Sequence, residues 1–219
     1  MPSSVLDLHG WKLAVPLEGE PGQPRELSGA QLAGFTSPNF ELTDEGDAVR
    51  FTAPVGGFVQ QGSEFARSEL RELDSAGRPA AWSSHTGVHE LQVDEAITDV
   101  PPVRPAIVSA QLHGTDNYVA LIRLDGNRLY VKTENAGEHT LDSDYRLGER
   151  FVVRMSVRGG EALITYGGAD THSAVTVPVD CTRCYFKVGS YLQTNEGHGD
   201  RPTSTGSVVV YDVQVSHRK

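Results

Sequence analysis

Short stretches of alternating apolar and polar residues recur along the whole chain, with turn signals between them. Hairpins are predicted at Asp125-Gly126-Asn127 and at Gly159-Gly160. Helical periodicity is nearly absent, and residues 27–32 predict only a short helical turn with Ser28 as its N-cap. The pattern therefore predicts an all-β fold, a sandwich or jelly roll of two antiparallel sheets. Strands are predicted at residues 48–53, 67–73, 86–93, 107–112, 118–124, 128–133, 151–157, 161–166, 185–193 and 207–216.

Length, charge and hydropathy limit the classes of protein that the chain can represent. Its 219 residues fit one domain, so we predict a single domain over residues 1–219. The formal net charge of −10 argues against a nucleic-acid partner, although a cleft can differ in sign from the whole molecule. No apolar run approaches the length of a membrane span. We expect a monomer that binds neither nucleic acid nor a membrane.

The first residues and the cysteines bear on the compartment. Residues 1–4 lack the basic start and apolar stretch of a signal peptide, so the chain is cytosolic or the mature form of a secreted protein. We expect a secreted protein. Cys181 and Cys184 are the only cysteines, with neither a thioredoxin-like pattern nor further zinc ligands around them. They are predicted to form a local disulfide or to remain two structural thiols.

Residues 185–193 have an unusual polarity for a half-buried strand. Alternation places one mostly apolar set on the core side and phenol, ammonium and amide groups on the other. A glycine among the polar residues is expected to leave room for a bound molecule. This face predicts binding of a polar, anionic ligand. Its residues are Tyr185, Lys187, Gly189, Tyr191 and Gln193.

Two other predicted strands have the same one-sided polarity. Arg67, Glu69 and Arg71 share one face, where two guanidiniums flank a carboxylate and form a fork for an anion. Gln111 and His113 share a face of another strand. Taken alone, the first segment fits a salt-bridged exposed strand better, and the second fits ordinary solvated side chains better. If all three faces line one concave sheet, their cations, amides and proton-transfer groups suit a uronic acid chain.

These segments resemble the three signature segments of the family 7 polysaccharide lyases, which are mostly alginate lyases with a β-jelly-roll fold. Segments similar to the family patterns R-[ST]-E-L-R, Q-[IV]-H and Y-F-K-A-G-x-Y-x-Q lie in order at residues 67–71, 111–113 and 185–193, with Val188 and Ser190 in place of the usual residues around Gly189. Residues 10–16 also resemble the N-terminal W-K-L-x-x-P of the family. The chain has Leu112 inside the second pattern, where Ile accompanies guluronate-containing substrates and Val accompanies polymannuronate. The resemblance implies a jelly roll with a concave substrate groove.

The resemblance also implies an activity, endolytic cleavage of a 1,4-linked uronate polymer, alginate, by β-elimination. Arg67, Gln111 and His113 would contact the carboxylate at the cleavage site. Tyr191 would protonate the departing oxygen and, in syn elimination, would also remove H5 as a phenolate. For anti elimination at guluronate, His113 is the expected base.

The remaining residues of the three segments are expected to bind the sugar chain. Glu69 is expected to orient the two arginines. Arg71, Tyr185, Lys187 and Gln193 are expected to hold the reacting or neighbouring sugars. We expect no metal and no cofactor, because the cations already present can neutralise the carboxylate. An acidic polysaccharide is the expected partner.

Three alternatives bear on this interpretation. A non-catalytic carbohydrate-binding module can share the sandwich architecture. A lyase acting on another polyuronate, such as polyglucuronate, needs the same grip on a carboxylate. A glycoside hydrolase needs two carboxylates across the bond, and Glu69 and Glu72 are predicted on opposite faces of their strand. Residues 56–65 and 195–205, rich in Gly and polar residues, are candidate lids over the groove.

Overall fold

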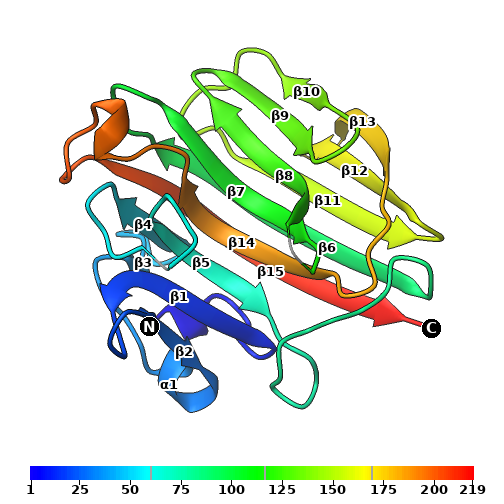
Figure 1. The fold of residues 1–219 in the computed structure, drawn as a ribbon, viewed down its shortest axis with the longest axis horizontal. Helices are drawn as coiled ribbons and strands as arrows, with labels where there is room; N and C mark the ends of the chain where they lie inside the picture. The colour runs from blue at the N-terminus through cyan, green and yellow to red at the C-terminus, as the bar shows by residue number, and fades with distance from the viewer. Residues whose placement is uncertain (60, 116, 169) are drawn as a thin grey trace.

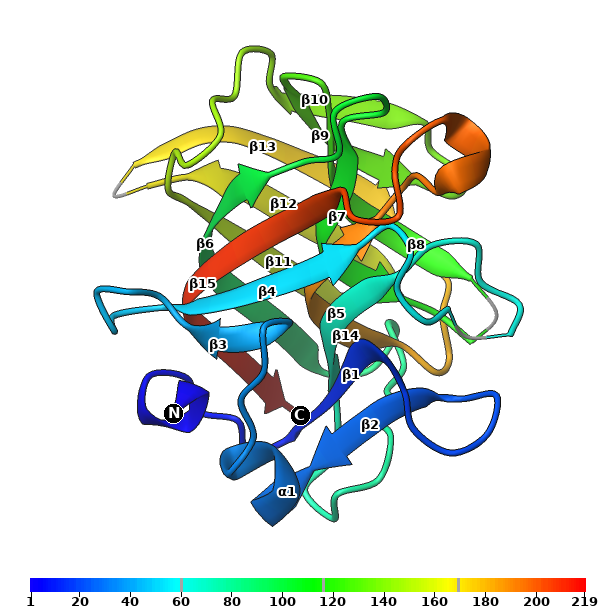
Figure 2. The same cartoon turned by 90° about the vertical axis from the view of Figure 1, so that its left-hand side faces the viewer.

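The computed structural model describes residues 1–59, 61–115, 117–168 and 170–219, and its strands form two antiparallel sheets packed face to face (Figures 1 and 2). The eight-stranded sheet has the order β10 (Glu138–Asp142), β9 (Arg128–Thr133), β8 (Tyr118–Asp125), β7 (Ala106–His113), β14 (Tyr185–Leu192), β5 (Arg67–Glu72), β1 (Trp11–Glu18) and β2 (Pro24–Ser28). The seven-stranded sheet has the order β13 (Thr171–Pro178), β12 (Glu161–Gly167), β11 (Phe151–Arg158), β6 (Val88–Asp99), β15 (Thr205–Arg218), β4 (Val49–Pro54) and β3 (Phe40–Leu42).

Helices are few and short in the described part of the chain. They are α1 (Gly29–Ala33), η1 (Pro2–Ser4) and η2 (Glu196–His198). Ser28 precedes α1 as predicted, although its side chain makes no capping hydrogen bond. None of the described helices is long and apolar enough to cross a membrane. The predicted fold class, two antiparallel sheets with little helix, is confirmed.

The predicted strands all form, and both predicted hairpins are present. β8 and β9 pair from Asp125 with Arg128, and β11 and β12 pair from Arg158 with Glu161. The sequence pattern missed five strands, of which β2, β10, β13 and β3 lie at or beside sheet edges. Edge strands such as β13 are exposed at most positions, so they lack the apolar alternation that marks a half-buried strand. The fifth, β1, has Pro16 and a register shift near its end.

The interior between the sheets takes the apolar face of β14. Phe186, Val188, Ser190 and Leu192 have no exposed surface, as the alternation predicts. Burying each large apolar side chain contributes roughly 1.5–3 kcal/mol. The Ser190 hydroxyl donates to the Gly206 carbonyl oxygen on β15 at 2.8 Å, so the one polar member of this face links the two sheets.

Glycine is needed at position 189 for a structural reason that differs from the expected one. Its φ is 139°, and a Cβ built on it would lie 2.5 Å from the Ser68 carbonyl oxygen and 2.9 Å from the Glu69 Cα. The close contacts are therefore with the backbone of β5, and the expectation that Gly189 leaves room for a ligand is wrong. The glycine lets β14 approach β5 where its pairing with β7 shifts register between Val188 and Tyr191.

A buried acid supports the irregular part of β7. The register of β7 with β8 shifts between Val108 and Ala110, and the intervening Ser109 is fully buried. Its hydroxyl donates to Glu95 Oε1 on β6 at 2.7 Å, while Glu95 Oε2 has no hydrogen-bond partner among the described residues. Burial raises the pKa of Glu95 to about 8, against the opposing effect of the Ser109 hydrogen bond.

Glu95 makes stability depend on pH with a definite sign. Between its ordinary pKa and about 8, the unfolded chain releases this proton and the folded chain retains it. The free energy of unfolding therefore falls as pH rises through that window. Glu95→Gln cannot ionise, so its stability relative to wild type should increase from pH 5 to pH 8 in urea unfolding. Glu90→Gln, on the same strand, is the control, and parallel curves for the Glu95 variant and wild type would contradict the prediction.

Candidate active site

One groove in the described structure gathers all nine predicted site residues. It has a volume of about 740 Å³ and lies on the outward face of the eight-stranded sheet. Its lining from the three signature segments is Arg67, Glu69, Arg71, Gln111, His113, Tyr185, Lys187, Tyr191 and Gln193.

Strand register explains why these residues meet. The three signature segments form the adjacent strands β7, β14 and β5, with β14 in the middle. Lys187 lies opposite Arg71 on one side and Gln111 on the other. Tyr191 lies opposite Arg67, and antiparallel pairing brings such side chains to about 4.5–5.5 Å between Cβ atoms.

Glu69 is the buried anion at the centre of the groove. Only 1% of its surface is exposed, and it accepts hydrogen bonds from Gln111 Nε2 and forms an ion pair with Lys187 Nζ. Arg67 NH1 lies 3.6 Å from Glu69 Oε2. Burial alone would raise the pKa of Glu69, but the charges of Lys187 and Arg67 outweigh it and hold the pKa below its ordinary value. Glu69 is therefore ionised, and it orients Lys187 and Gln111.

Lys187 is a buried cation of the groove. It is 8% exposed, and burial lowers its pKa to about 8, with the charge of Arg67 acting in the same direction and Glu69 opposing. At neutral pH the ammonium is charged beside Glu69. Loss of its proton in mildly alkaline solution would remove one positive charge from the groove.

The two arginines are oriented by aromatic rings more than by Glu69. The Arg67 guanidinium carbon lies 3.9 Å from the ring centre of Tyr191, and that of Arg71 lies 4.1 Å from the ring centre of Tyr185. The two cations pack against the phenol faces. Arg71 forms no ion pair with Glu69 in the described structure, so the expected role of Glu69 is corrected for Arg71. Ser63 Oγ also accepts a hydrogen bond from Arg67 NH2 at 2.6 Å.

His113 is held as a neutral imidazole with one nitrogen available. Its Nδ1 lies 2.9 Å from the Gly114 carbonyl oxygen, which can only accept, so Nδ1 carries the proton. Its ring stacks on Tyr185 with the centroids 4.9 Å apart. Burial lowers the pKa of His113, chiefly by desolvation, so the ring is neutral at pH 7. In this tautomer Nε2 has the free lone pair of a general base.

Three further cationic residues that the three signature segments do not include also line the groove. Lys12 lies on β1, Arg123 on β8 and Lys132 on β9, and all three line the groove. Alternation along β8 and β9 places them on the same face as their polar neighbours, but without the sheet order nothing connects them to the signature segments. Of the predicted lids, residues 61–65 line the groove, whereas residue 60 lies outside the described residues and 195–205 are not among the lining.

Leu112 faces away from the groove. It is fully buried in the core between the sheets, although Gln111 and His113 on either side line the groove. Any effect of this position on the choice of substrate must therefore act through the position of β7 and not through contact with a sugar.

Charge in the groove is opposite to that of the whole chain. Six cationic side chains line it against three carboxylates, in a protein of formal net charge −10. Among the described residues, no cluster of three His, Cys, Asp or Glu side chains has metal-binding geometry. A jelly roll with a cationic open groove, a neutral His and a Tyr beside an arginine is the framework of an enzyme that acts on acidic polysaccharides.

Comparison with known proteins identifies the family. The family model described as alginate lyase matches residues 6–217, so the chain belongs to the alginate lyase family. The structure is similar to the alginate lyase AlgAT5 of polysaccharide lyase family 7, with a TM-score of 0.94 and 37% identity over 100% of this chain and 99% of that one. The comparison with curated proteins gave no match.

Two further solved structures are similar over nearly their whole length. An alginate lyase from Corynebacterium sp. has a TM-score of 0.91 and 35% identity, covering 99% of this chain and 97% of that one. An alginate lyase from Pseudomonas aeruginosa has a TM-score of 0.83 and 29% identity, covering 97% and 100%. The resemblance drawn from the sequence motifs is thereby confirmed, and the chain is a polysaccharide lyase of the alginate lyase family.

Replacing the central anion tests the electrostatics of the groove. Glu69→Gln leaves Lys187 buried without its counter-charge, which should lower the free energy of unfolding at pH 7 by about 3–5 kcal/mol. Glu26→Gln is the matched control, because Glu26 is half exposed and pairs with Lys12 at 2.8 Å. Its effect should be under about 1 kcal/mol. Equal effects in urea unfolding would show that Glu69 does not hold the groove together.

Proposed function

We propose that this chain cleaves alginate within the polymer by β-elimination and releases unsaturated oligosaccharides. The observation that supports this function most strongly is the arrangement on β5, β14 and β7. There Tyr191 and His113 flank a group of cations and an amide that suits a carboxylate. A binding module has no need of a neutral imidazole with a free lone pair beside such a centre.

The chemical difficulty of the reaction is the weak acidity of H5, which is alpha to an ionised carboxylate. Its removal places further negative charge on the carboxylate oxygens. Arg67 and the second N–H of Gln111 are positioned to bind that carboxylate and stabilise the enolate-like transition state. Glu69 assists indirectly, since it fixes the Gln111 amide and the Lys187 ammonium.

Proton transfer is assigned to Tyr191 and His113. A base removes H5, the electron pair forms the C4–C5 double bond, and the C4–O bond breaks toward the leaving sugar. Tyr191 gives its proton to that oxygen, and in syn elimination it acts as a phenolate and removes H5 itself. For guluronate, where H5 lies on the opposite face, His113 Nε2 is the base, consistent with the tautomer that Gly114 imposes.

The extent of the groove supports cleavage inside the chain. Its lining runs from Glu26 on β2 to Lys132 on β9, across six strand spacings, or about 29 Å. Several sugars can lie across that distance. Arg71, Tyr185, Lys187 and Gln193 then hold the reacting and neighbouring sugars. Product formation on polymannuronate, polyguluronate and polyglucuronate, followed by ultraviolet absorbance and product size, tests both the substrate and the endolytic mode.

Tyr191→Phe separates catalysis from binding. The variant retains the ring that packs under Arg67 and loses only the hydroxyl, so turnover should fall by at least about a thousandfold. The Kd for an alginate oligosaccharide, measured by calorimetry, should stay within about threefold of wild type. Tyr211→Phe, on β15 of the other sheet, is the control. Full activity of the Tyr191 variant would exclude the proposed role.

The alkaline limb of the pH profile should report Lys187. Because its pKa is lowered to about 8, its charge is present below that pH and is lost as pH rises through it. KM for alginate should therefore increase above about pH 8. Lys187→Arg retains the charge, so its KM should stay flat over the same range. An alkaline rise in KM that persists in the arginine variant would assign the limb to another group.

A further inference from the structure

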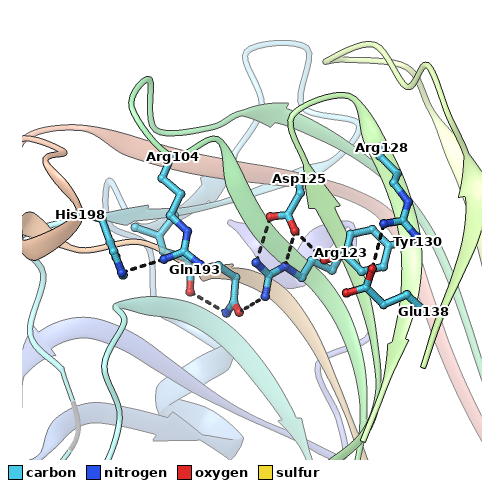
Figure 3. A network of polar contacts seen from close by, with 9 residues as sticks. Arg104, Arg123, Asp125, Arg128, Tyr130, Glu138, Gln193 and His198 are labelled. Carbon is cyan, nitrogen blue, oxygen red and sulfur yellow. Dashed lines mark hydrogen bonds and ion pairs between the residues drawn. The ribbon is translucent and has the colours of Figure 1, made fainter. Parts of the chain in front are cut away.

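Arg123 holds a groove residue that belongs to a signature segment. Arg123 lies on β8, opposite Val108 of β7 and Tyr130 of β9, and is 8% exposed. Its NH1 donates a hydrogen bond to Gln193 Oε1 at 2.9 Å, as Figure 3 shows. Arg123 and Gln193 are 70 residues apart in the chain, and the contact exists because β8 and β14 flank β7 in the same sheet.

The contact determines which way the Gln193 amide faces. Gln193 is 7% exposed, and its Nε2 donates to the Leu192 carbonyl oxygen at 2.8 Å. A flipped amide would place its NH2 group against the Arg123 guanidinium, and both groups can only donate. Gln193 is therefore fixed with its oxygen on Arg123. The second N–H of Nε2 makes no hydrogen bond among the described residues and is available to a molecule bound in the groove.

Arg123 is itself held at further points and is electrically neutralised. Its Nε and NH2 donate to the two carboxylate oxygens of Asp125 at 3.1 and 3.0 Å. Asp125 also accepts a hydrogen bond from the Tyr130 hydroxyl at 2.5 Å. A guanidinium with this forked contact cannot rotate without breaking several hydrogen bonds at once.

We propose that Arg123 is a positioning residue for substrate binding: by locking the Gln193 amide it makes the sugar site beside Tyr191 a hydrogen-bond donor toward a uronate carboxylate or hydroxyl. The inference rests on the proposed function and deepens it. Gln193 follows Tyr191 by two residues on the same groove face, so the donor lies next to the proton-transfer group. Neither the signature segments nor their spacing includes Arg123.

Kinetics of three variants test the proposal. Arg123→Met removes the hydrogen bond that fixes the Gln193 amide. KM for alginate should therefore rise at least about tenfold, with a smaller change in kcat, because a hydrogen bond to a charged group is lost. Arg123→Lys retains one donor and should recover part of the loss. Arg128→Met is the control, because Arg128 packs on Tyr130 at 4.4 Å but does not line the groove. Its KM should stay within about twofold of wild type.

A double-mutant cycle distinguishes positioning from general support of the fold. If Arg123 acts through Gln193, Arg123→Met should add under about twofold to KM in a Gln193→Ala background. If the fold-changes in KM caused by Arg123→Met and by Gln193→Ala instead multiply in the double variant, the proposal is overturned. An unchanged KM in Arg123→Met, with wild type and Arg128→Met active, would overturn it too.

A variant at Gln193 tests the proposal even if Arg123→Met does not fold. Gln193→Glu forms an ion pair with Arg123 and retains the shape of the side chain, which offsets the loss of the hydrogen bond to the Leu192 carbonyl oxygen, and it removes the N–H that is available to the groove. Its KM should rise at least about tenfold, and the Kd for an alginate oligosaccharide in a Tyr191→Phe background should rise in parallel. An unchanged Kd and KM would overturn the inference. Absence of unsaturated product from wild type would instead contradict the proposed function.

Discussion

The arrangement of the groove depends on one buried carboxylate. Glu69 is almost inaccessible to water, yet it is ionised, because Lys187 and Arg67 surround it and Gln111 donates to it. The same interaction keeps Lys187 charged near neutral pH despite burial and fixes the direction of the Gln111 amide. The groove can thus present cations and an N–H donor to a uronate without losing them to rotation or neutralisation.

The second constraint is the close pairing of β5, β14 and β7. Gly189 lets β14 approach the β5 backbone, and the Glu95–Ser109 hydrogen bond from the other sheet supports the irregularity in β7. The Ser190 hydroxyl on β14 donates a hydrogen bond to β15 of the other sheet. The positions of Tyr191 and His113 therefore depend on contacts in the core as well as in the groove. Leu112, between Gln111 and His113, is one of the residues that make the core contacts.

Chemistry in the groove is divided among groups with different surroundings. His113 is neutral because it is desolvated, although its hydrogen bond to the Gly114 carbonyl oxygen opposes this effect, whereas Lys187 is charged at neutral pH because it is paired with Glu69. Arg123 is likewise fixed by a neighbour: Asp125 pairs with its charge, and Arg123 in turn orients the Gln193 amide. In each case a neighbouring group fixes the orientation or the charge of a side chain that lines the groove.

The sequence by itself determined the fold class, the face of each signature strand and the family. Alternation has a period of two residues, so it assigns Lys187 to the groove and Val188 to the core without further information. Only the tertiary structure decided which strands are neighbours. Strand order results from long-range pairing, so the contact between Arg123 and Gln193, the stacking of Arg71 on Tyr185 and the need for glycine at 189 have no local signal. Alternation along one strand specifies which way a side chain points, but the residue that it meets lies on a strand far away in the chain.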